Sequence, residues 1–107
     1  MPVINIVNIR GGHDSDAVTH FYCDRRSPVG NPFAMSHKQS RDDVCDQYEE
    51  YFHERMIGTS IRDHEFQEYV YDIQRAYVDG DVSLLCWCAP LRCHTQTIKN
   101  YILEEAK

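Results

Sequence analysis

The fold is organised around the stretch Val82-Ser83-Leu84-Leu85-Cys86-Trp87-Cys88-Ala89-Pro90-Leu91-Arg92-Cys93-His94, near the C-terminus. Its first half is a run of apolar and sulfur-containing residues that follows a turn signal at Asp79-Gly80, which predicts a buried strand. Its second half predicts a turn into a helix. The segment Cys86–His94 holds three of the chain's five cysteines and one of its six histidines. A functional site is therefore expected where this strand gives way to the helix.

The composition is that of one globular domain. The chain has 107 residues, 42% of them hydrophobic and 26% charged, which argues against disorder. It has no apolar run of membrane-spanning length and no N-terminal secretion signal, so we expect a cytosolic protein without a membrane partner. In such a protein an odd number of cysteines favours free thiols, metal ligands or reactive groups over disulfides. The net charge of −6 argues against non-specific nucleic-acid binding.

Periodicity and turn signals give the order of the elements. Residues 3–9 and 18–23 are rich in β-branched and aromatic residues and predict two strands, the first of them mostly buried, joined by a hairpin or by a loop to a neighbouring strand. Residues 24–33 contain two prolines and a glycine and predict a long, defined loop. Ser40 and Asp43 form a capping box at the start of the first helix. Apolar residues at helical spacing predict three helices, over 40–58, 63–78 and 93–105.

The elements therefore run strand, strand, helix, helix, strand, helix. A late strand that two helices separate from the early strands requires a crossover connection. The sequence thus predicts a small single-domain α/β layer fold with a mixed or partly parallel sheet flanked by helices, in which the cysteine-rich strand is central. Ligands of such sheets lie at the carboxyl ends of the strands, where the 24–33 loop and the turn at 89–94 both begin.

The cysteine cluster has three interpretations. Four sulfur and nitrogen ligands in nine positions favour a zinc site of Cys86, Cys88, Cys93 and His94, although the spacing is not that of a recurring zinc motif. A thiol at a helix N-terminus has a lowered pKa, which favours a catalytic pocket with Cys88 or Cys93 as nucleophile and His94 as acid or base. Buried cysteine also packs as a small hydrophobe, which fits Cys86 best.

The 24–33 loop is a second candidate site. It combines two cations, a hydroxyl, a glycine and an amide, in Arg25, Arg26, Ser27, Gly30 and Asn31. Such groups on a rigid loop are suited to clamp an anion or to read a base edge. The alternative is that the loop is only a turn, with its arginines solvated or paired with the chain's excess carboxylates.

Two motifs resemble an uncharacterised family of phages and bacteria, the domain of unknown function 4326. Its members pair an early Gly-Arg-Pro-Ser-x-Trp-Gly-Asn-Pro-Phe loop with a late Cys-Trp-Cys-Ala-Pro-x-x-Cys-His. The late motif is complete here over 86–94, whereas Asp24, Arg26 and Val29 replace the Gly, Pro and Trp of the early one. The resemblance implies that the two motifs face one pocket. It also implies that a nucleobase would stack on Trp87, Tyr22 or another ring, since Val29 replaces the tryptophan.

We therefore expect a domain that binds a small anionic ligand, such as a nucleotide or nucleotide derivative, between the two motifs. Arg25, Ser27, Gly30, Asn31 and Trp87 are the expected binding residues, and Cys88, Cys93 and His94 would process the ligand. Two other functions are open. One is a non-enzymatic phage protein that inhibits or sequesters a host component, such as a host protein, through its acidic surface. The other is a structural zinc domain.

Overall fold

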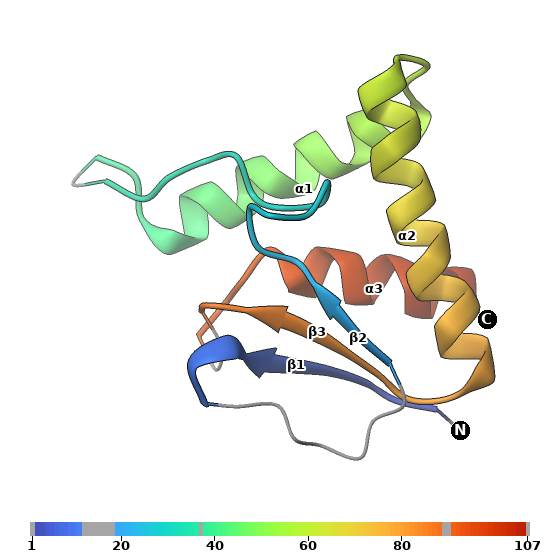
Figure 1. Cartoon of the computed structure of the whole chain (residues 1–107). Helices are drawn as coiled ribbons and strands as arrows, with labels where there is room; N and C mark the ends of the chain where they lie inside the picture. The colour runs from blue at the N-terminus through green and yellow to red at the C-terminus, as the bar shows by residue number, and fades with distance from the viewer. Residues whose placement is uncertain (1, 12–18, 37, 89–90, 107) are drawn as a thin grey trace.

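A three-stranded parallel sheet forms the centre of the computed structural model, which describes residues 2–11, 19–36, 38–88 and 91–106. The strands are β1 (Ile4–Asn8), β2 (Thr19–Tyr22) and β3 (Val82–Cys86), in the spatial order β1-β3-β2. Because β3 pairs in parallel with both neighbours, the carboxyl ends of all three strands meet at one edge of the sheet (Figure 1).

The predicted α/β fold and the central position of the cysteine-rich strand are confirmed. The sheet is parallel throughout the described strands, where a mixed sheet was the other possibility. A hairpin between the first two strands is wrong, because β3 lies between them. Both early strands are shorter than expected, and a short 3-10 turn over Ile9–Gly11 follows β1. The turn residues 89–90 and Val18 lie outside the described residues.

Three helices follow the predicted order: α1 (Arg41–Ile57), α2 (Ile61–Asp79) and α3 (Thr95–Glu105). The expected Ser40 capping box at α1 is present, and Ser60 and Asp63 form a second one at α2. Because that box starts α2 at Ile61, the predicted start at Asp63 is wrong by one half turn. The predicted start of the last helix at Cys93 is also wrong, since α3 begins at Thr95. No helix among the described residues has the length and apolar character needed to cross a membrane.

The core lies between the sheet and the helices. All five residues of β3 are buried, which is expected for the central strand of a parallel sheet. Only Ile4 of the edge strand β1 is fully buried, so the prediction of a mostly buried first strand is wrong. Val82 and Leu84 join residues of all three helices in one cluster, which includes Tyr48, Phe52, Phe66, Val70, Ile73, Ile98 and Ile102. The radius of gyration of 13.5 Å is that of one compact domain of this length.

Replacing Leu84 by Ala is expected to lower the free energy of unfolding by about 2–5 kcal/mol, because it leaves a cavity in the centre of this cluster. The measurement is urea unfolding followed by circular dichroism. Leu91→Ala is the matched control, because Leu91 is 58% exposed whereas Leu84 is fully buried. The control should change the free energy by no more than about 0.5 kcal/mol. Equal losses in the two variants would contradict the assigned core.

Candidate functional site

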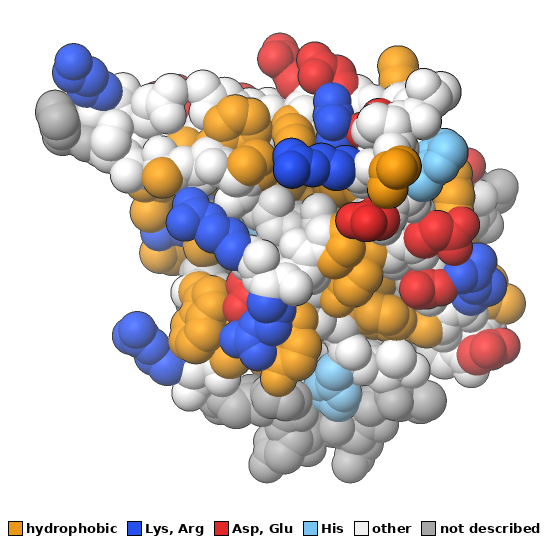
Figure 2. All heavy atoms as spheres, turned by 45° about the horizontal axis from the view of Figure 1, so that its top comes forward, with side chains coloured by type: hydrophobic (Ala, Val, Ile, Leu, Met, Phe, Trp, Pro, Cys, Tyr) orange, Lys and Arg blue, Asp and Glu red, His pale blue; other side chains and the backbone are white. Residues whose placement is uncertain are grey.

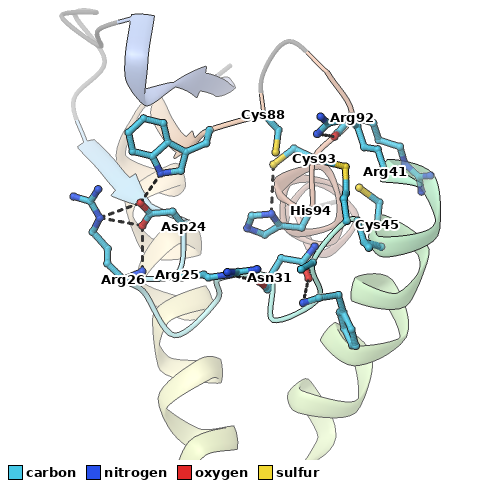
Figure 3. A pocket seen from close by; sticks show the side chains of 15 residues that line it. Asp24, Arg25, Arg26, Asn31, Arg41, Cys45, Cys88, Arg92, Cys93 and His94 are labelled. Carbon is cyan, nitrogen blue, oxygen red and sulfur yellow. Dashed lines mark hydrogen bonds and ion pairs between the residues drawn. The ribbon is translucent and has the colours of Figure 1, made fainter. Parts of the chain in front are cut away.

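A pocket of about 480 Å³ lies at the carboxyl edge of the sheet. The 24–35 loop, the start of α1 and the segment after β3 line it. Figure 3 shows Asp24 and Arg26 on one side and Arg41 and Arg92 on the other, with His94 between them. The two sequence motifs are therefore brought to one cavity. The lining residues that carry polar or reactive groups are Asp24, Arg25, Arg26, Asn31, Arg41, Cys45, Trp87, Cys88, Arg92, Cys93 and His94.

Most of the candidate residues line this pocket. The loop contributes Arg25 and Asn31, and the segment around the end of β3 contributes Trp87, Cys88, Cys93 and His94. Cys86 does not line the pocket. It is buried at the end of β3, as the core interpretation expects.

Ser27 and Gly30 do not line the pocket but shape the loop that does. The Ser27 hydroxyl donates to the Asp24 carbonyl at 3.0 Å, and the Ser27 backbone N–H donates to the same oxygen at 3.0 Å. A Cβ on Gly30 would lie 2.5 Å from the Asp24 oxygen and 2.7 Å from Arg25 Cα. Any other residue at Gly30 would therefore push the two sides of the loop apart.

Cys93 and His94 form a side-chain pair at the back of the pocket. His94 Nδ1 lies 3.4 Å from Cys93 Sγ, and His94 Nε2 lies 2.5 Å from the Cys23 carbonyl oxygen. A carbonyl oxygen only accepts hydrogen bonds, so Nε2 carries the proton and Nδ1 of the neutral ring has a free lone pair. That lone pair faces the Cys93 thiol. A proton that leaves Cys93 Sγ therefore has an acceptor within hydrogen-bond reach.

The surroundings of Cys93 favour its thiolate. Hydrogen bonds from the Cys86 thiol and from the Thr95 backbone N–H lower the pKa of the Cys93 thiol, although burial opposes them. Two other buried thiols behave in the opposite way, since burial raises the pKa of Cys23 and of Cys45. Of the two nucleophiles that the sequence left open, Cys93 is therefore the one whose contacts stabilise the reactive form.

His94 is held as a neutral base. Its side chain is buried, and burial lowers its pKa, although the hydrogen bond to Cys23 raises it. The ring of Tyr48 packs edge-on against the imidazole, with centroids 4.9 Å apart. The Tyr48 hydroxyl donates to the Val29 carbonyl at 2.7 Å and so fastens the loop to α1. Val29 itself is fully buried, so the position where the family has tryptophan is a core position in this chain.

The pocket lining is basic although the chain is acidic. Acidic residues outnumber basic ones by 17 to 11 in the sequence, but four arginines and one aspartate line the pocket. Figure 2 shows the same contrast, with basic and hydrophobic side chains dominating the side where α1 begins and acidic ones dominating the other. An anion would therefore meet a favourable local field in this pocket.

Two of the four pocket arginines are neutralised and two are not. Arg26 pairs with Asp24 at 3.0 Å, and Arg92 pairs with two carboxylates of α1, those of Asp42 and Asp46. Arg25 donates to the Asn31 carbonyl at 3.2 Å, and Arg41 donates to the Arg92 carbonyl at 3.4 Å. Within the described residues neither of these two guanidinium groups pairs with a carboxylate. They are the cations best placed to meet a ligand anion.

The zinc interpretation gains no geometric support. Among the residues that the structure describes, no three His, Cys, Asp or Glu side chains are arranged to hold a metal ion. The proposed ligand His94 has both ring nitrogens in contact with protein atoms, Cys93 Sγ and the Cys23 carbonyl. Binding zinc through either nitrogen would require one of these contacts to break.

Among the polar or reactive residues of the pocket, sequence reasoning assigned no role to Arg41, Cys45 and Arg92, and it gave Asp24 none beyond its place in the loop motif. Arg41 and Cys45 lie in the first turns of α1, on the side of the helix that meets the segment before α3. The one sequence feature that could have identified Arg41 and Cys45 is that the predicted start of this helix closely follows the 24–33 loop. Asp24 accepts from the indole N–H of Trp87, 63 positions away. A contact between residues so far apart in the sequence cannot be predicted from a local sequence pattern.

The lowered pKa of His94 predicts a loss of stability in mild acid. Between the ordinary value of 6.5 and the lower value in the fold, the unfolded chain binds a proton that the folded chain does not. The free energy of unfolding should therefore decrease as the pH falls below about 6.5. Urea unfolding at several pH values measures how the free energy of unfolding depends on pH. His94→Gln should flatten this decrease, and His53→Gln, at an exposed position, should not. Equal pH dependence in all three proteins would contradict the assignment.

The comparisons with known proteins agree with the sequence motifs. The family model described as Domain of unknown function (DUF4326) matches residues 7–104. No match was found among curated proteins or among solved structures. The matched range contains the loop, α1, β3 and the Cys93–His94 pair, and so includes every residue of the pocket. The chain belongs to the DUF4326 family of domains of unknown function.

Proposed function

We propose that this domain binds a small anionic ligand, a nucleotide or nucleotide derivative, in the pocket between the two motifs and processes it with Cys93 as nucleophile. The observation that carries the proposal is that Arg25 and Arg41, which pair with no carboxylate among the described residues, lie in the same cavity as the Cys93–His94 pair. Arg25 is exposed and Arg41 is half-buried, so an anion that enters the pocket can form charge-assisted hydrogen bonds with both guanidinium groups.

The Cys93–His94 pair supplies the chemistry of the proposal. Cys93 Sγ would attack an electrophilic centre of the bound ligand, and the electron pair of the broken bond would go to the leaving group. His94 Nδ1 would take the thiol proton and return it to the leaving group. The Cys23 carbonyl holds His94 in the tautomer that this step requires. Cys88 also lines the pocket but lacks the imidazole contact.

Binding is tested by calorimetric titration with AMP at low salt. Replacing both Arg25 and Arg41 by Gln should weaken AMP binding at least about tenfold, because each lost charge-assisted hydrogen bond is worth about 1.5–3 kcal/mol. Arg62→Gln is the matched control, since Arg62 is an exposed arginine outside the pocket. Unchanged affinity in the double variant, or no binding of AMP to the unmodified protein at millimolar concentration, would refute the anion site.

The nucleophile is tested by alkylation with iodoacetate, an anion, and with iodoacetamide, its neutral analogue. The thiolate displaces iodide in both reactions, and mass spectrometry of peptides identifies the modified cysteine. Cys93 should react faster than Cys45, whose pKa is raised. The Arg25→Gln/Arg41→Gln variant should slow only the iodoacetate reaction, by about two- to fivefold. Faster modification of Cys45, or equal slowing of both reagents, would contradict the proposed site.

A further inference from the structure

The side chain of Trp87 is exposed yet held in place. Its ring lines the pocket, and the residue keeps 49% of its surface accessible. The indole N–H donates to the Asp24 carboxylate at 3.0 Å, and the Asn8 amide donates to the Trp87 carbonyl at 3.1 Å. Both the backbone and the ring are therefore fixed by residues of other segments. An exposed tryptophan that is fixed in this way loses little conformational entropy when a ligand covers it.

The Asp24 carboxylate that fixes the ring is itself clamped. Arg26 Nε donates to both oxygens of Asp24 at 3.0 Å. The Arg26 guanidinium in turn lies over the Tyr22 ring, 4.1 Å from its centroid. A continuous line of contacts thus joins the end of β2, the loop and the segment after β3. The dashed lines of Figure 3 show its Asp24 contacts at one side of the pocket.

Trp87 and Arg41 offer different groups to a ligand. On the side of Trp87, Asp24 and Arg26 neutralise each other, and the Arg10 guanidinium lies over the indole ring, 5.9 Å from its centroid. Arg41 lies on the opposite side of the pocket (Figure 3) and has no carboxylate partner within the described residues. The exposed indole suits a planar ring and Arg41 suits an anion, so a ligand that carries both groups would place its planar end against Trp87 and its anionic end toward Arg41.

We infer that Trp87 is the stacking platform for a planar heteroaromatic ring, so that the ligand is a nucleotide and not a simple phosphate or sugar phosphate. The inference rests on the proposed anion site and adds the residue that selects the base. Base stacking on an aromatic side chain tolerates every base, so Trp87 would select for the presence of a base and not for its identity. Phe33 also lines the pocket, but its ring packs edge-on against Tyr51, with ring centroids 5.8 Å apart.

The experiment compares AMP with ribose 5-phosphate, which carries the same phosphate without a base. Trp87 is the only tryptophan of the chain, so intrinsic fluorescence reports this ring alone. AMP should quench the fluorescence and ribose 5-phosphate should not. In calorimetry AMP should bind about five- to hundredfold more tightly than ribose 5-phosphate. Trp87→Ala should remove this preference while leaving the affinity for ribose 5-phosphate unchanged, and Phe33→Leu should retain it.

The outcomes separate the inference from the proposed function. Equal affinities for the two ligands, without quenching, would refute the stacking role of Trp87 and leave the anion site standing. Loss of the preference in Phe33→Leu but not in Trp87→Ala would refute it as well. Binding of neither ligand would refute both the anion site and the platform. A circular dichroism spectrum and unfolding midpoint like those of the unmodified protein would show that each variant is folded.

Discussion

The hydrogen bond between His94 and the Cys23 carbonyl connects the parts of the site. It joins the residue that precedes α3 to the residue that follows β2, which are 71 positions apart in the chain. It also fixes the imidazole tautomer, so that Nδ1 faces Cys93. Tyr48 packs against the same ring and holds the loop through Val29. The buried imidazole therefore contacts Cys93, the residue after β2 and α1 at the same time.

The fold explains why an acidic chain presents a basic cavity. Parallel strands place three carboxyl ends at one edge, and the segments that leave two of them, after β2 and after β3, carry arginines. The carboxylates of α1 neutralise Arg92, while Asp24 neutralises Arg26. Arg25 and Arg41 are left to interact with a ligand. The net charge of the chain is thus acidic, but the charge of the pocket depends only on the few residues that the fold brings together there.

The sequence was sufficient for the fold because its signals were local. The apolar run 82–86, the Ser40 capping box and the crossover argument required only neighbouring residues. The Ser60–Asp63 box had the same signal, and the start of α2 could have been predicted from it. The start of α3 could not, because His94 at its N-cap position makes no side-chain capping bond and turns its ring toward Cys23.

The candidate site was predictable in part. Placing Arg25, Asn31, Cys93 and His94 near one edge needed only strand direction. Ser27 and Gly30 looked like ligand-binding groups, but the loop uses them for its own geometry. Composition also could not distinguish Cys93 from Cys88. That difference depends on the contacts of Cys93 with His94, Cys86 and Thr95, which exist only in the folded chain.

The central claim is that a nucleotide-like anion binds where the two motifs meet. The most direct measurement is the change of backbone amide chemical shifts on titration of ¹⁵N-labelled protein with AMP. The account predicts saturable shifts in residues 24–35, at the start of α1, and in residues 87–88 and 91–94. The opposite end of the sheet and the far half of α2 should not respond. Shifts confined to other surfaces, or no shifts at millimolar AMP, would contradict it.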